Sequence, residues 1–260
     1  ESLLEAITVI ETLPAPLARK IGLVALASGR NGRARIMLEK SYETAPGDDT
    51  TLKILEHIAT LDGDINSRRH WIEARLFLSP DDPELLRSHA HLLVAQGDQE
   101  AERDVLRLEA LGLDTPADRS LLSGLRERAG SRSEALDAID RALAEDPTRA
   151  KDWYHRAELL LAEKEPVKAL DSVDRCIELE RQNGDAWALR AKLLADSPRV
   201  EEACKAATHA VALNAGGVEL VILKADLLLA MGEFGRSEKT LEKALEENEN
   251  DGEMRASIAN

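Results

Sequence analysis

Histidines and cysteines are the side chains of this sequence best suited to catalysis or metal binding. The 260 residues include six histidines and two cysteines. His89 and His91 lie two positions apart, and in a helix such neighbours point to different sides. Cys176 and Cys204 belong to neither a CxxC motif nor a Cys/His cluster. We therefore expect no metal site, and we expect Cys176 to be a buried thiol.

Motifs that catalyse reactions or bind nucleotides are missing from the sequence. It has no phosphate-binding loop and no nucleophile elbow. The segment Gly29-Arg30-Asn31-Gly32 contains two glycines, but it lies between two expected helices and does not follow a strand. It is interpreted as a turn. We expect a protein that is not an enzyme and that uses no cofactor.

The elements that carry these side chains repeat with a period of 34 residues. A small residue returns at this step through most of the chain, with an imperfect step in the second repeat. These positions are Ala34, Ser67 or Arg68, Ala101, Ala135, Ala169, Ala203 and Ser237. A second series precedes it by four or five residues and predicts turns between helices. Its members are Gly29, Gly63, Gly97, Gly130, Lys164, Pro198 and Gly232. A fixed period of this length is typical of a repeat protein.

Apolar residues within each repeat have helical spacing. Trp153, Ala157 and Leu160 recur at steps of three and four, and no segment alternates convincingly as a strand. Prolines, which cannot continue a helix, fall where one repeat follows another, at Pro46, Pro80, Pro116 and Pro147. The sequence therefore predicts an all-α solenoid of antiparallel helix pairs.

The repeats resemble the tetratricopeptide repeat. The clearest match is Trp153, Ala157 and Leu160, followed by Ala169 and Cys176. The next repeat fills the same slots with Trp187, Ala191, Leu194, Ala203 and Ala210. The resemblance implies a right-handed superhelix of seven units, which start near residues 15, 49, 83, 116, 150, 184 and 218. It is strong for the fold and weak for the function.

Two short segments fall outside these seven units, which cover residues 15–250. Residues 1–14 are expected to form the second helix of a partial leading repeat. Residues 251–260 are expected to be the truncated start of a further helix. Both suggest a piece of a longer protein.

The charge narrows the kinds of partner. With 34 basic and 49 acidic side chains, the chain has a formal charge of −15. This disfavours nucleic acid, which requires a basic face. No segment is apolar enough to span a bilayer, so we expect a soluble chain, cytoplasmic or periplasmic, without direct membrane insertion. A protein or peptide partner is the simpler expectation.

The resemblance implies a binding groove, because in this family the first helix of each unit lines the inner face. Carried over unit by unit, one inward row contains Arg19, Lys53, Arg87, Ser120, Tyr154, Ala188 and Ile222. The row one turn later contains Leu23, His57, His91, Gly124, Glu158, Lys192 and Asp226. The candidate partner-binding residues are Arg19, Lys53, His57, Arg87, His91, Tyr154, Glu158 and Lys192.

Arg19, Lys53 and Arg87 form a basic ladder in the N-terminal half of this groove. The ladder predicts an acidic peptide or a terminal carboxylate as the ligand. The alternative is that the three cations are solvated or paired with acids such as Glu56 and Glu84. The carboxylate clamp of chaperone-binding members does not transfer, because Leu23, His57 and His91 stand where that clamp has asparagines.

Three functions stay open at this stage. The first is a non-catalytic protein-interaction scaffold that binds a partner segment in the groove, and it is preferred. The second is a self-assembling structural scaffold, a homo-oligomer joined through its end helices. The third is a targeting or regulatory arm of a larger bacterial protein or enzyme, for example in envelope or polysaccharide machinery.

Overall fold

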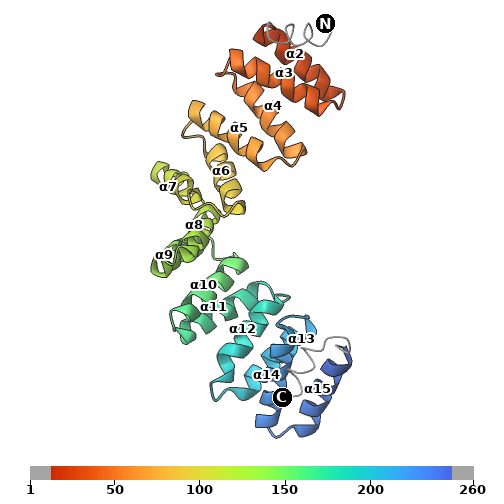
Figure 1. Ribbon diagram of the computed structural model, residues 1–260. Coiled ribbons are helices and arrows are strands. Elements are labelled where there is room, and N and C mark those ends of the chain that lie inside the picture. The colour runs from red at the N-terminus through yellow and green to blue at the C-terminus, as the bar shows by residue number, and fades with distance from the viewer. Residues whose placement is uncertain (1–12, 248–260) are drawn as a thin grey trace. The chain divides into compact units, whose positions relative to one another are not determined.

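The computed structural model describes residues 13–247, and all regular structure in that part of the chain is α-helical (Figure 1). Within these residues, fourteen helices form seven pairs. The first helices of the pairs are α2 (Ala15–Ala27), α4 (Asp49–Leu61), α6 (Pro83–Ala95), α8 (Pro116–Arg128), α10 (Ala150–Ala162), α12 (Gly184–Ala195) and α14 (Gly217–Ala230). The second helices are α3 (Asn31–Thr44), α5 (Ile65–Leu78), α7 (Ala101–Leu111), α9 (Arg132–Glu145), α11 (Pro166–Leu179), α13 (Val200–Ala212) and α15 (Phe234–Glu247). The partial helices expected at 1–14 and 251–260 lie outside the described residues, apart from Leu13 and Pro14.

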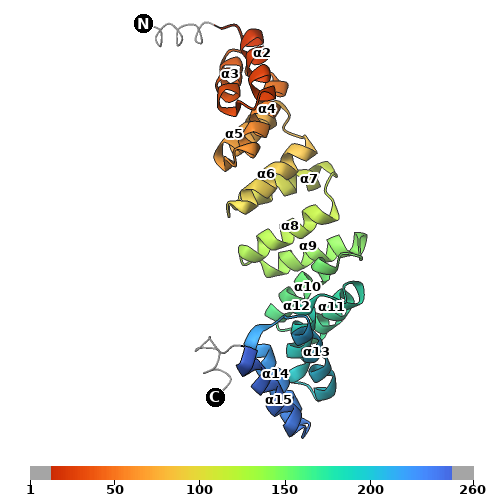
Figure 2. The ribbon, with the colours of Figure 1, turned by 90° about the vertical axis from the view of Figure 1, so that its right-hand side faces the viewer.

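The helices belong to two compact units, divided between Asp114 and Thr115. Unit 1 contains α2 to α7, and unit 2 contains α8 to α15. Within each unit, every first helix packs against the second helix of its own pair, and that second helix packs against the next first helix. Figure 2 shows paired helices such as α8 and α9 side by side, joined by a short turn. The predicted all-α repeat architecture is confirmed.

In six of the seven described pairs, the turn between the two helices contains one residue with a left-handed backbone; the α12–α13 turn has none. Gly63 has φ +69°, and the glycines at the same place in four other pairs are similar. In α10–α11 this position is Lys164, which adopts φ +60° although it has a side chain. Glycine reaches this conformation without steric cost, and a residue with a Cβ does not. The turn geometry is therefore imposed by the packing of the two helices, and Lys164 bears some strain.

Small residues form the contact between the helices of a pair. Ala34, Ala101, Ala135, Ala169 and Ala203 are completely buried. A side chain limited to one methyl group lets two helices approach closely, and the larger aliphatic residues fill the layers between pairs. Arg68 stands at this slot in α5 and is half-buried, so the second pair departs from the rule.

Capping side chains mark where several helices begin. Asp48 and Asp82 accept hydrogen bonds from backbone N–H groups in the first turns of α4 and α6. Thr115 and Asp118 form a reciprocal capping box at the start of α8. Such caps satisfy N–H groups that have no partner within the helix. They fix the entry of each first helix and hence the position of its exposed side chains.

Candidate functional site

The eight candidate groove residues are divided between the two units. Five lie on the first helices of unit 1 and three on those of unit 2. The unit 1 set comprises Arg19 on α2, Lys53 and His57 on α4, and Arg87 and His91 on α6. The unit 2 set comprises Tyr154 and Glu158 on α10 and Lys192 on α12.

Each cation of the basic ladder has an acidic partner. Arg19 Nη1 lies 3.1 Å from Asp48 Oδ2. Lys53 Nζ lies 2.7 Å from Asp49 Oδ2, one turn earlier on α4. The three ladder side chains differ in exposure, and Lys53 is the most open of them, with 56% of its side-chain surface accessible.

Arg87 is the most constrained of the three. Its Nη1 lies 3.1 Å from Glu84 Oε1, and its Nη2 donates a 2.6 Å hydrogen bond to the carbonyl oxygen of Leu113. Glu56 is the other acid considered as a ladder partner, and its Oε2 lies 2.5 Å from Nη1 of Arg75 on α5. The ladder is thus a row of ion pairs in which Lys53 is the most accessible cation.

The two histidines of the groove set, His57 and His91, are both exposed. In unit 2, Tyr154 is half-buried. Burial, together with the nearby charge of Glu158, raises the pKa of Tyr154 to about 12. Burial also raises the pKa of Glu158, although a hydrogen bond with Tyr154 opposes the change. Tyr154 and Glu158 therefore form one polar pair, while Lys192 lies apart from them on the wall of a cavity beside α10 and α11.

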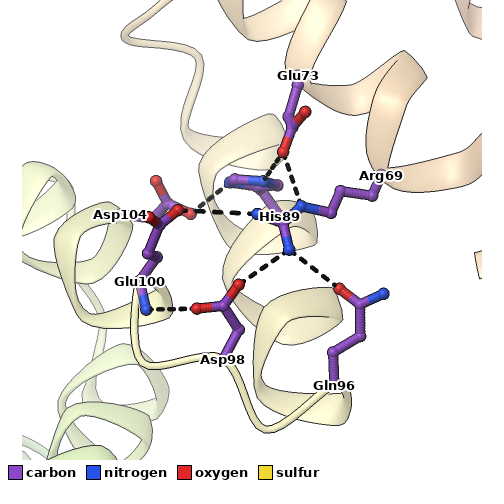
Figure 3. Close-up of polar contacts among 7 residues, drawn as sticks. All are labelled: Arg69, Glu73, His89, Gln96, Asp98, Glu100 and Asp104. Atoms are coloured by element: carbon purple, nitrogen blue, oxygen red, sulfur yellow. Dashed lines mark hydrogen bonds and ion pairs between the residues drawn. The ribbon is translucent and has the colours of Figure 1, made fainter. Parts of the chain in front are cut away.

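The most elaborate polar cluster of unit 1 surrounds His89, a residue that the groove hypothesis did not include (Figure 3). His89 Nδ1 donates a 2.7 Å hydrogen bond to Asp104 Oδ2 on α7. Its Nε2 lies 3.5 Å from Glu73 Oε1 on α5. Arg69 contacts the same Glu73 oxygen at 2.7 Å and Asp98 Oδ2 at 2.9 Å. The cluster joins α5, α6 and α7 through charged groups.

The surroundings of His89 favour its protonated form. Burial opposes protonation, but the hydrogen bond and charge of Asp104, followed by those of Glu73, outweigh it. The pKa of His89 is therefore raised above its ordinary value. His89 and Asp104 are both more than nine-tenths buried, so solvent screens their attraction weakly.

The contact between Glu73 and His89 recurs in unit 2 with arginine in place of histidine. Arg156 Nε donates a 2.6 Å hydrogen bond to Asp140, sixteen residues earlier. Arg190 Nε donates an equivalent 2.6 Å bond to Asp174, again sixteen residues earlier. In each case an acid on a second helix holds a cation on the next first helix. The His89 cluster is thus a variant of a joint between repeats. The 34-residue step from Arg156 to Arg190 was the sequence signal for it.

A cavity of about 660 Å³ lies beside this joint, between α5 and α7, with α6 as its floor. Glu73 and His89 line it on the polar side, and Leu86 lines the floor. Phe77 and Leu106 form part of its wall. Sequence reasoning missed Phe77 and Leu106 because it considered only the first helices.

In the described part of the chain, no group of three or more His, Cys, Asp or Glu side chains is arranged so that it could hold a metal ion. Cys176 and Cys204 are buried thiols. Burial raises the pKa of Cys176 to about 11. None of the helices in residues 13–247 is long and apolar enough to cross a membrane.

Residues 218–251, which include α14 and α15, match the family profile described as tetratricopeptide repeat. Helices α14 and α15 thus form a tetratricopeptide repeat, and the other described helix pairs have the same fold. The helix pairs, small-residue contacts and 34-residue period of the chain are those of this repeat. A comparison with curated proteins finds no match.

Solved tetratricopeptide-repeat structures share the fold. The C-terminal part of a repeat-containing protein from Cytophaga hutchinsonii has a TM-score of 0.69 at 12% identity, over 90% of this chain and 97% of that one. A tetratricopeptide repeat protein from Parabacteroides merdae has a TM-score of 0.58 at 15% identity, over 95% and 99%. YrrB, described as a TPR protein with an unusual peptide-binding site, has a TM-score of 0.56 at 14% identity, over 68% and 91%. Identities this low show a common fold alone.

Proposed function

We propose that this protein is a non-catalytic interaction scaffold that holds a segment of a partner protein along the first helices of unit 1. The observation that carries the proposal is the row formed by Arg19, Lys53 and Arg87 on α2, α4 and α6, with the exposed His57 and His91 one turn further on. The peptide-binding site of YrrB, a protein of the same fold, gives independent support for a peptide as the ligand.

The segment bound in unit 1 carries carboxylates. Exposed ion pairs contribute only about 0–1 kcal/mol each, because solvent competes for both charges. Lys53 and Asp49 are both about half exposed, so the pair exchanges at little cost for a pair between Lys53 and a ligand carboxylate. Arg19 can do the same, since Asp48 also remains accessible. Arg87 has the smaller part, because it is held by Leu113 as well as Glu84.

Lys53→Glu tests this proposal, with Lys20→Glu as the matched control. Both residues are exposed lysines on first helices of unit 1, and both substitutions change the net charge equally. Each protein is used as bait in a lysate of the source organism, and the affinity for captured partners is then measured at low and high salt. We expect Lys53→Glu to weaken binding about tenfold at low salt and less at high salt, because ionic screening removes the difference.

An unchanged affinity and salt dependence for Lys53→Glu would end the acidic-segment proposal. Light scattering on the same samples separates the alternatives. A mass that rises with concentration, without a captured partner, would favour the self-assembling scaffold instead. Equal losses for Lys53→Glu and Lys20→Glu would indicate a general effect of charge and no specific groove.

A further inference from the structure

The cavity lined by α5, α6 and α7 is a second candidate binding site, and none of the eight groove residues lines it. Figure 1 shows α5, α6 and α7 following one another in unit 1. Its wall on α7 runs from Glu100 to Ala110. These ten residue steps correspond to about 15 Å at about 1.5 Å per step, or roughly three turns of a helix. At about 660 Å³ the cavity is large enough to receive several side chains.

Phe77 and Leu106 distinguish this place from the equivalent places in the other repeats. Counting from the slot that Arg68 fills in α5 and a small residue fills in the other second helices, Phe77 is nine positions later and is 86% exposed. The other repeats have Glu43, Ala110, Ala144, Glu178, Ala212 and Glu246 there. Leu106, 38% exposed, is five positions later, where the others have Glu39, Glu73, Asp140, Asp174, Thr208 and Glu242. Two apolar side chains thus line one cavity at slots that are otherwise small or polar.

The charged side chains at the rim of the cavity indicate which charge a ligand must carry. Arg103 and Arg107 lie one turn apart on α7, and Leu106 lies between them. Arg107 pairs with Asp81 through side chains that are both about half exposed, so this pair is open to exchange. Arg103 is exposed, and no acid in residues 13–247 forms an ion pair with it.

Each of the three acids that line the cavity has a basic partner. Asp104 is held by His89, and Glu73 by Arg69. Glu100 Oε2 lies 3.7 Å from Arg69 Nη2. The charged side chains beside Leu106 that can still bind a ligand are therefore the cations Arg103 and Arg107, which complement carboxylates.

We infer that this cavity binds an amphipathic helix of a partner protein, whose large apolar side chains enter between α5 and α7 and whose acidic side chains face Arg103 and Arg107. A cavity flanked by two helices, with Phe77, Leu86 and Leu106 in its lining, suits a helix laid between them. Phe77 is the apolar contact on α5, and Leu106 the one on α7. This site is independent of the groove proposed above, since the two share no residue.

A selection with a phage-displayed library of random 12-residue peptides tests the inference. The wild-type protein is the target, and the Phe77→Glu/Leu106→Asp variant is used to subtract peptides that bind elsewhere. Both substitutions introduce the residue that other repeats of this chain carry at the slot, so the fold is preserved. We expect the enriched peptides to combine Leu, Phe or Trp at helical spacing with Asp or Glu one turn away.

Synthetic versions of the enriched peptides then give the affinities. We expect Phe77→Glu and Leu106→Asp each to weaken binding about tenfold or more, as for a buried apolar anchor. Arg103→Glu should weaken it chiefly at low salt. Ile36→Glu, which alters an exposed apolar residue on α3, is the matched control and should have no effect. Lys53→Glu should have none either, which separates this site from the groove.

Three results would overturn the inference. The first is the absence of any enriched peptide that depends on Phe77 and Leu106. The second is enrichment of peptides with basic flanking residues, which would contradict the role of Arg103 and Arg107. The third is self-association of the wild-type protein that Phe77→Glu abolishes, because a second copy would then be the occupant.

Discussion

The buried pair of His89 and Asp104 allows a quantitative test of how the repeats of unit 1 are joined. The chain itself supplies suitable replacements, because the slot of His89 holds Leu55 in α4 and Leu122 in α8. The slot of Asp104 likewise holds an alanine in α9 and in α13. The informative variants are therefore His89→Leu, Asp104→Ala and the double substitution.

The expected magnitudes follow from burial. Each side chain keeps only 10% of its accessible surface. His89→Leu leaves the carboxylate of Asp104 buried without its hydrogen-bond donor, which costs about 3 kcal/mol. Asp104→Ala leaves His89 in contact with Glu73 and costs about 1–2 kcal/mol. The double variant leaves no unpaired charge at either position. Its free energy of unfolding should therefore lie within about 1 kcal/mol of the wild-type value.

The pH dependence provides a second expectation. The pKa of His89 in the folded chain lies above its unfolded value of about 6.5. The stabilisation that comes from its proton is therefore complete below about pH 6.5 and is lost as the pH rises through the raised pKa. The wild-type protein should be less stable at about pH 9 than at about pH 6, whereas the double variant should lack this part of the change.

Urea unfolding followed by the fluorescence of Trp71 measures both effects. Trp71 is buried in unit 1, whereas the other two tryptophans, Trp153 and Trp187, lie in unit 2. A Trp153→Phe/Trp187→Phe background makes the signal specific to unit 1. The reasoning would be refuted if His89→Leu cost the same free energy of unfolding in the wild-type chain as in the Asp104→Ala variant. A wild-type profile in which stability at alkaline pH equals that at acidic pH would refute the charged form of the pair.

Three further predictions concern packing, capping and reactivity. Gly22→Ala should destabilise unit 1 by about 1–3 kcal/mol, because the new Cβ would lie 2.7 Å from Leu38 Cγ. Gly32→Ala has open space around its Cβ and should stabilise the unit by up to about 1 kcal/mol. The urea midpoints of the two variants measure both effects. Thr115→Ala should cost about 1 kcal/mol in thermal unfolding through loss of the capping box. Cys176, with its pKa raised to about 11, should react with a thiol-specific disulfide reagent at neutral pH only after urea is added.

The fold could be predicted from the sequence because the residues that determine each repeat lie close together along the chain. A small residue such as Ala135 must lie where two helices touch, and Gly130 marks the turn before it. These features recur at a fixed step, so a weak signal in one repeat is confirmed by its neighbours. Lys164 shows the limit of this reasoning, since its left-handed backbone is imposed by helix packing and not by its own conformational preference.

The site was less predictable because its contacts are not local. The partner of Arg19 on α2 is Asp48, at the start of α4. The partner of Arg75 on α5 is Glu56 on α4. Sequence spacing therefore gave a row of cations but not the acids that accompany it. Phe77 and Leu106 come together only because α5 and α7 flank the same cavity. Neither is conspicuous in the sequence until the repeats are aligned with one another.

The charge pairs between repeats determine where the chain can be lengthened by duplication of a repeat. In two joints of unit 2, α9–α10 and α11–α12, the acid belongs to one repeat and the cation to the next, at the same separation. A tandem copy of residues 141–174 would place a new arginine opposite the existing Asp174 and a new aspartate opposite Arg190. Lengthening by duplication at this point leaves no orphaned charge. A copy of the equivalent segment of unit 1, residues 74–106, would place the copied His89 opposite Leu106 and not opposite an acid, so the array extends more freely in unit 2.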